Sequence, residues 1–187
     1  GIAVRAVEIE RLRERPVVQD LMALTRALVH VGDRVAWLSV LRAPWCGLTL
    51  TDCLSLLGGD RHASVPRLLR REDLRQQLDP SARKRLERCL PVLEQALDEK
   101  RQLGLRDAVE RAWHALGGPA TLGSERELEE AHAYLDALGD VEGDAPGEPV
   151  DLVRLGEALL ELYAPAHARL DTYVELLTIH KSKGLQF

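Results

Sequence analysis

The chain has 187 residues and a formal net charge of −5, and 45% of its residues are hydrophobic while only 4% are aromatic. This composition excludes general disorder, and no apolar run approaches the ~20 residues that cross a bilayer, so we expect no membrane partner. The chain contains 35 leucines, which favours a helical core, because pleated sheets select β-branched and aromatic residues.

The three cysteines are Cys46, Cys53 and Cys89, and they form no Cys-x-x-Cys motif. An odd number of unpaired cysteines is typical of a reducing compartment, so we expect a cytoplasmic protein. The chain starts without Met and stops in an apolar stretch, which indicates a piece of a longer protein.

Local signals predict the first elements in order. Alternating apolar residues favour a short strand over 1–9. Pro16 suits the first turn of a helix that Gly32 stops, and Asp33 suits the N-cap of a second helix that Pro44 ends. The sequence Thr49-Leu-Thr-Asp52 predicts a capping box that opens a third helix through Leu57.

The rest of the chain also reads as helical until a last strand. Helical spacing continues over 65–103, with a break at Asp79-Pro80, and Pro91 is expected to kink or restart that helix. The further expected elements are helices over 105–116, 125–138 (opened by a capping box of Ser124 and Glu127) and 151–163, an acidic loop over 139–149, and a buried strand over 173–179. The predicted fold class is therefore mainly α, with a helical unit flanked by two short strands.

Charge is unevenly distributed along the chain. Residues 1–103 carry 18 Lys and Arg against 14 Asp and Glu, a net +4, whereas residues 104–187 carry 7 against 16, a net −9. Within 61–88 there are nine cations and four acids. This segment either contacts phosphate or is a solvated helix face with local ion pairs, and the second arrangement is the commoner one.

The sequence offers no complete active site, and we assign no catalytic residue. Gly118 and Gly123 have the spacing of a phosphate-binding loop, but Ser124 stands where the lysine is required. The acids of 140–144 alternate as in a calcium loop, yet Ala145 occupies the position that needs glycine. The histidines lack metal-ligand spacing, so no metal site is predicted.

The most specific signal lies at the C-terminus, where residues 174–187 read Val-Glu-Leu-Leu-Thr-Ile-His-Lys-Ser-Lys-Gly-Leu-Gln-Phe. This segment resembles motif V of the superfamily 1A DNA helicases of the UvrD/Rep type. A strand that delivers a hydroxyl, an imidazole and lysines to its C-terminal end suits contact with a phosphate backbone. The resemblance implies that Thr178, His180 and Lys181 bind single-stranded DNA.

The same resemblance places Gly184 and the residue after Leu185 toward the nucleotide. That residue is acidic in the family and is Gln186 here. An uncharged amide replaces the carboxylate that would accept a hydrogen bond from a ribose hydroxyl, so the nucleotide contact departs from the family pattern.

The N-terminal third supports the same resemblance. Gly1-Ile2 opens the chain as in the strand after motif IV, and residues 42–48 read Arg-Ala-Pro-Trp-Cys-Gly-Leu, which is similar to helicase–nucleases of the RecB/AddA type. In the family this turn leans on duplex DNA, which implies duplex contacts for Gly47, Leu48 and Thr49. A glycine turn before a helix start also suits phosphate through free N–H groups and hydroxyls, although a plain helix junction with Trp45 in the core remains an alternative.

The resemblance implies three regions: a strand of motor subdomain 2A over 1–14, a helical subdomain 2B over 15–168, and a strand with motif V over 169–187. The flanking strands would then belong to a RecA-like α/β motor. We expect these 187 residues to be inactive alone and to form the DNA-binding, regulatory part of an ATP-dependent 3′–5′ helicase in DNA repair or recombination. ATP and Mg²⁺ would serve only the longer protein, with the remaining helicase subdomains as partners. The alternative is a helical interaction module that docks a partner subunit of a helicase–nuclease complex.

Overall fold

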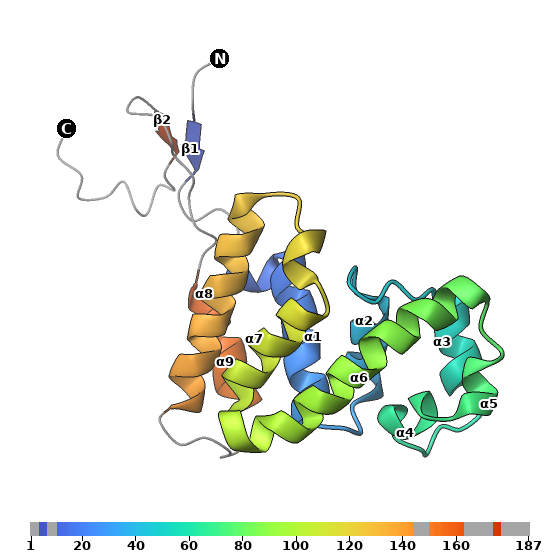
Figure 1. The fold of residues 1–187 in the computed structure, drawn as a ribbon. Coiled ribbons are helices and arrows are strands. Elements are labelled where there is room, and N and C mark those ends of the chain that lie inside the picture. The colour runs from blue at the N-terminus through green and yellow to red at the C-terminus, as the bar shows by residue number, and fades with distance from the viewer. Residues whose placement is uncertain (1–3, 7–10, 144–149, 163–173, 177–187) are drawn as a thin grey trace.

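The computed structural model describes residues 4–6, 11–143, 150–162 and 174–176, and for the two strands it describes the backbone alone. The described part is mainly helical (Figure 1). In chain order its elements are β1 (Val4–Ala6), η1 (Leu12–Glu14), α1 (Pro16–Val29), α2 (Arg34–Arg42), α3 (Leu50–Leu57), α4 (Val65–Leu69), α5 (Glu72–Arg75), α6 (Pro80–Leu103), α7 (Leu105–Ala115), η2 (Gly118–Thr121), α8 (Glu125–Glu142), α9 (Leu152–Glu161) and β2 (Val174–Leu176).

The two strands pair in parallel although they lie near opposite ends of the chain. Val4 is opposite Val174, and Ala6 is opposite Leu176. The two strands that flank the helical unit are thus direct neighbours in one sheet at these positions. The other residues of 1–9 and 173–179, over which the two strands were expected, lie outside the described residues.

The helical part begins and ends at one place. The backbone N–H of Leu12, in η1, donates to the carbonyl of Leu162, which follows α9, at 2.9 Å. Leu12 is fully buried, and η1 packs against both α1 and α9. The chain therefore enters and leaves the helical part at adjacent positions.

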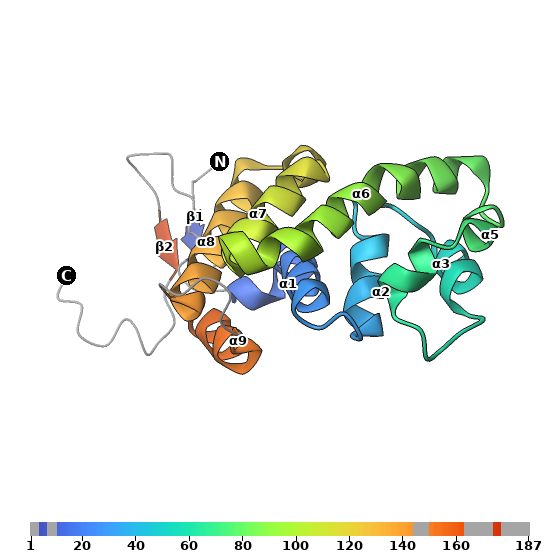
Figure 2. The ribbon, with the colours of Figure 1, turned by 60° about the horizontal axis from the view of Figure 1, so that its bottom comes forward.

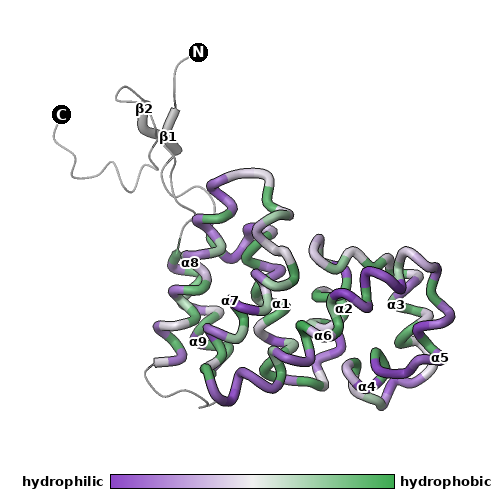
Figure 3. The backbone as a smooth tube through the Cα atoms, viewed as in Figure 1, coloured by the Kyte–Doolittle hydropathy of each residue, from purple (hydrophilic) through white to green (hydrophobic). Residues whose placement is uncertain are grey.

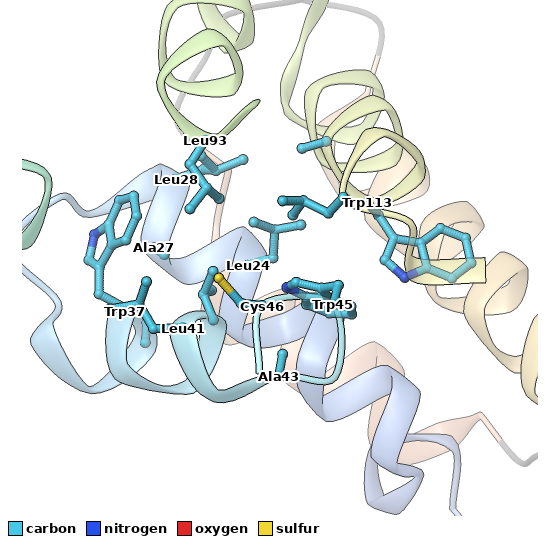
Figure 4. Close-up of a cluster of buried hydrophobic side chains, with 14 of the residues drawn as sticks. Leu24, Ala27, Leu28, Trp37, Leu41, Ala43, Trp45, Cys46, Leu93 and Trp113 are labelled. Carbon is cyan, nitrogen blue, oxygen red and sulfur yellow. The ribbon is translucent and has the colours of Figure 1, made fainter. Parts of the chain in front are cut away.

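Helix α1 lies at the centre of the core. It packs against α2, α7 and α8, and its buried side chains include Leu21, Leu24 and Leu28. Figure 4 shows Leu24 and Leu28 beside Trp37, Cys46 and Leu93, which come from α2, the turn after it and α6. The helical period predicted this apolar face because residues three and four apart lie on one side of a helix.

The long helix α6 connects two parts of the helical body. Figures 1 and 2 show α1, α7, α8 and α9 together on one side and α3, α4 and α5 at the other end, with α6 running between them. Figure 3 shows hydrophilic and hydrophobic residues alternating along α8, as expected for a helix with one buried face.

Helix starts follow the local signals. Pro16 opens α1, and the carboxylate of Asp33 accepts from the N–H of Ala36 at 3.0 Å. At the start of α8 the Ser124 hydroxyl accepts from Glu127 N–H at 3.3 Å. The reciprocal bond differs from a standard capping box, because the Glu127 carboxylate accepts from Gly123 at 2.6 Å.

Of the kink or restart expected at Pro91, the restart is wrong, because α6 runs as one helix through this residue. Proline leaves the carbonyl four residues earlier without an intrahelical donor. Pro91 and Glu87 are both exposed, so water can bind that carbonyl, and α6 continues.

The expected loop over 139–149 begins too early, because α8 continues through Gly139 to Glu142. The Glu142 carboxylate accepts from the backbone N–H groups of Leu105 and Arg106, the latter at 2.8 Å. These bonds at the start of α7 offset the roughly 1 kcal/mol that a helical glycine costs. Residues 144–149 lie outside the described part.

Candidate nucleic-acid interface

The turn over 43–48 reverses the chain between α2 and α3. The carbonyl of Ala43 accepts from Cys46 N–H at 2.9 Å and from Gly47 N–H at 2.8 Å, and Leu48 N–H donates to Leu41 at 3.0 Å. Gly47 has φ +65°, a left-handed conformation that glycine adopts without a Cβ clash. We call this segment the Gly47 turn.

The start of α3 follows directly, and its first polar groups bind one another. Thr49 N–H and Thr49 Oγ1 each lie 2.8 Å from Oδ2 of Asp52, whose own N–H donates to Thr49 Oγ1 at 3.1 Å. The capping box is therefore confirmed, but the expectation of free hydroxyls and N–H groups is only partly met. Leu50 and Thr51 are exposed, and their first-turn N–H groups have no partner within the helix.

The three residues expected to contact duplex DNA have different environments. Gly47 and Thr49 are exposed, whereas the Leu48 side chain is 3% exposed and packs in the core with Trp45. Leu48 could therefore offer DNA only its carbonyl, because its N–H is bonded to Leu41. DNA contact by all three residues stays a prediction.

Two arginines of α6 lie against this turn. A Cβ placed on Gly47 would be 3.6 Å from Cδ of Arg85. Arg88 donates from Nη2 to the carbonyl of Trp45 at 2.6 Å. Arg85 also approaches Asp52, with Nη2 4.0 Å from Oδ2. Two cationic groups thus stand beside an exposed turn and a helix N-terminus, where the helix dipole adds positive potential.

Four other arginines of the basic segment 61–88 form ion pairs or contacts with backbone carbonyls. Arg70 pairs with Glu94, Arg71 with Asp73, and Arg75 with Glu72. Arg83 donates to the carbonyls of Arg75 and Gln76 at 3.2 and 2.9 Å. These arginines are thus held by contacts within the protein, whereas Arg85 and Arg88 of α6 lie against the Gly47 turn.

Sequence reasoning found the basic segment and the turn separately but did not join them. The Arg88 bond to Trp45 crosses 43 positions in the sequence. No local pattern reports such a contact, since it depends on how α6 packs over the turn after α2. The missed residues of the candidate interface are therefore Arg85 and Arg88.

The thiols lie beneath the same turn. Cys46, Cys53 and Cys89 are buried, and the Cys89 thiol donates to the carbonyl of Trp45 at 3.6 Å. A hydrogen bond with Cys89, together with burial, holds the pKa of Cys46 above its ordinary value, so this residue stays a neutral thiol. Among the described residues no three His, Cys, Asp or Glu side chains are placed to hold a metal ion.

The structure does not describe the predicted site residues of the segment that resembles motif V. Thr178, His180, Lys181, Gly184 and Gln186 lie outside the described residues. Their roles with DNA and nucleotide stay predictions from the sequence.

Comparison with known proteins gives no further assignment. No protein-family model matches the chain, and no curated protein matches it. In the part of the chain that the structure describes, the helices are too short or too polar to cross a bilayer.

Proposed function

We propose that this chain is the DNA-contacting, regulatory part of an ATP-dependent 3′–5′ DNA helicase. In this proposal the helices form a 2B-type insertion, and β1 and β2 belong to the sheet of a RecA-like motor subdomain. The helices contact duplex DNA at the Gly47 turn, and the segment after β2 contacts single-stranded DNA and nucleotide.

The adjacent entry and exit of the helical part support the proposal that the helices are an insertion into a sheet. Leu12 and Leu162 are joined by a backbone hydrogen bond, and β1 and β2 are adjacent parallel strands. Adjacent parallel strands require a crossover connection, and here the crossover contains the described helices from α1 to α9. An insertion into one sheet has this geometry because the chain must return to the strand beside the one it left.

The observation that carries the DNA-binding role is the position of Arg85 and Arg88 beside the Gly47 turn. Guanidinium groups bind phosphate oxygens through two donors at once, without reading bases. The first-turn N–H groups of Leu50 and Thr51, which have no partner within α3, add donors at the same place. Contact with the sugar–phosphate backbone is what a helicase needs, because it acts on any sequence.

ATP and Mg²⁺ belong to the proposal only through the longer protein. Gly184 and Gln186, the residues that the resemblance places toward the nucleotide, lie outside the described residues. We therefore derive no catalytic step from this chain, and we expect the DNA-binding part to be testable on its own.

The first test measures binding of the 187-residue chain to forked and duplex DNA by electrophoretic mobility shift over a range of salt concentrations. Binding through phosphates should weaken as salt rises, with a slope of about −0.9 for each phosphate neutralised. Replacing Arg85 and Arg88 together by Gln should weaken binding several-fold. It should also reduce the steepness of the salt dependence by the amount that corresponds to about two phosphate contacts.

Arg101→Gln is the matched control, because Arg101 is exposed on the same helix, about four turns from Arg85. It should leave affinity and salt slope unchanged. Salt-independent binding, or equal losses in the control and in the double variant, would remove the support for a phosphate-binding turn. Absence of binding would favour the interaction-module alternative.

A second test separates charge from backbone strain at the turn. Gly47→Asp and Gly47→Asn both place a Cβ at φ +65°, and Asn and Asp tolerate this conformation better than most residues. Only the aspartate would set a carboxylate beside Arg85 and the phosphate. We expect Gly47→Asp to weaken duplex and fork binding several-fold more than Gly47→Asn does, with a smaller effect on single strands. Equal losses for both variants would point to strain rather than phosphate contact.

A further inference from the structure

A groove of about 500 Å³ lies between α2 and α3, and Arg85 and Arg88, which carry the proposed DNA contact, are not among its lining residues. Its apolar lining includes Leu38 of α2 and Leu50 and Leu54 of α3. Leu50 is 64% exposed and Leu54 is 68% exposed. These two leucines lie one helical turn apart and both face solvent, so with Leu38 they form an apolar surface without a partner in the described chain.

The rim of this groove is positively charged. Arg34 is held there by hydrogen bonds from its two Nη atoms to the carbonyls of Leu57 and Ala63, both at 2.8 Å. Arg61 is exposed and also lines the groove. No lining residue is acidic, and the nearby Asp33 is already bound to Arg26 at 2.7 Å. The groove thus selects an apolar surface that carries carboxylates.

The outer face of α9 has this chemistry. Its inner residues, Leu155 and Leu159, are buried, whereas Val153 is 70% exposed and Leu160 is 38% exposed. Glu157 is exposed as well. Val153, Glu157 and Leu160 are spaced four and three apart and therefore lie on one side of the helix. We call this surface the α9 stripe.

The groove and the α9 stripe cannot meet within one chain, because Figures 1 and 2 both place α9 and α3 at opposite ends of the helical body. We propose that the α9 stripe of one copy docks into the α2–α3 groove of a second copy, in a head-to-tail arrangement. The uneven charge of the sequence favours this pairing, since residues 1–103, which contain both helices of the groove, carry a net +4, and residues 104–187, which contain α9, carry a net −9.

The expected association is weak and open-ended. A contact made by one ten-residue helix falls below the roughly 1,200 Å² of a standard stable interface. Since different surfaces of the two copies meet, each dimer keeps one free groove and one free stripe, and further copies can add. The average mass should therefore rise steadily with concentration and fall when salt screens the charges.

The test is sedimentation velocity of the 187-residue chain over a concentration series. Leu54→Glu places a carboxylate in the groove, and Glu157→Arg reverses the charge of the stripe. Each variant alone should stay monomeric. An equimolar mixture should form a dimer and nothing larger, because an intact stripe on one variant meets the intact groove on the other.

Val35→Glu is the matched control, since Val35 is 66% exposed on α2 but lines a different groove. It should associate like the unaltered chain. Circular dichroism checks that each variant keeps its helices, and Arg61→Glu replaces Leu54→Glu if that variant loses them. A monomeric unaltered chain at all concentrations, association of either single variant alone, or a mixture that stays monomeric would each overturn the proposal.

Discussion

At some contacts between elements, the packing leaves no room for a side chain larger than that of glycine. Trp113 of α7 is fully buried, and the backbone of Gly118 lies against its indole ring. A Cβ on Gly118 would lie 1.9 Å from Nε1 of Trp113, so the glycine is required for packing. A Cβ placed on Gly156 in α9, by contrast, would have no atom within 4 Å.

These two glycines should respond oppositely to alanine. Gly118→Ala forces a large buried ring to move, and we expect a loss of about 1–3 kcal/mol in the free energy of unfolding. Gly156→Ala adds a methyl group to open space within a helix, which should raise stability by about 0.5–1 kcal/mol. Urea unfolding followed by circular dichroism measures both, and a neutral Gly118→Ala would show that this packing is looser than described.

Asp20 shows what partial burial does to a carboxyl group. It is half-buried on α1, and burial raises its pKa to about 6. The folded protein therefore binds this proton more tightly than the unfolded chain does. The resulting stabilisation is present below about pH 4 and is lost as pH rises through about 6.

Asp20→Asn should remove this pH dependence. Above about pH 7 the variant should be more stable than the unaltered chain by about 1 kcal/mol, since screening by solvent reduces the effect of the full shift. Below about pH 4 the gain should disappear, because both side chains are then neutral. Thermal unfolding at several pH values checks this, and a gain that does not depend on pH would contradict burial as the cause.

Besides the shared hydrophobic core, side chains that complete the ends of other helices join whole elements. Glu142 at the end of α8 binds the first N–H groups of α7. Lys100 near the end of α6 donates to the carbonyl of Leu28 in the last turn of α1. Each bond satisfies a helix terminus that lacks an intrahelical partner and places a favourable charge there.

Removing one such contact should cost more than removing an equal charge nearby. Glu142→Ala leaves the first N–H groups of α7 without their acceptor, and we expect a loss of about 1–2 kcal/mol. Asp140→Ala removes an exposed carboxylate from the same turn of α8 and should change stability by less than about 0.5 kcal/mol. Chemical denaturation of both variants measures the two losses in the free energy of unfolding. Equal losses would count against the capping role of Glu142.

Element starts could be predicted from the sequence, because an N-cap binds N–H groups two or three residues away. Asp33, Thr49 and Ser124 were assigned for this reason. Whether a helix continues past Pro91 or Gly139 could not be predicted from the sequence. The outcome depends on which side of α6 faces water and on where Glu142 finds its donors, and these facts belong to the packed structure.

The candidate interface shows the same division. The Gly47 turn was predicted from a local pattern, but its buried Leu48 and its neighbours Arg85 and Arg88 were not. A run of basic residues does not reveal which cations meet acids and which meet a turn far away in sequence. The sequence alone does not show that the hydroxyl of Thr49 is bonded to Asp52, because a capping box and a phosphate site use the same residues.

At the scale of the whole molecule, the ends of the described chain meet. Arg5 is opposite Glu175 in the parallel strand pair, and paired strands lie about 4.8 Å apart. Replacing both residues by Cys should allow a disulfide, because this spacing falls within the usual Cα separation. The native cysteines are buried and can stay in place.

The cross-link should form quickly under mild oxidation and appear as a faster band on a non-reducing gel, with mass spectrometry to identify the pair. Arg101→Cys combined with Glu175→Cys is the control, since Arg101 lies near the end of α6 and is not a strand partner. A cross-link of equal yield in the control, or none in the strand pair, would contradict the parallel register.

The three tryptophans have a practical consequence. Trp37, Trp45 and Trp113 are all the tryptophans of the chain, each is at most 2% exposed, and in the described structure none of their indole N–H groups has a hydrogen-bond partner. Dry, unbonded indoles emit at short wavelengths, so the folded chain should have a blue-shifted intrinsic fluorescence. Trp45 lies within the Gly47 turn, whereas Trp113 lies in α7. Variants that keep only one of them would give separate optical signals from the two parts of the body, without an attached dye.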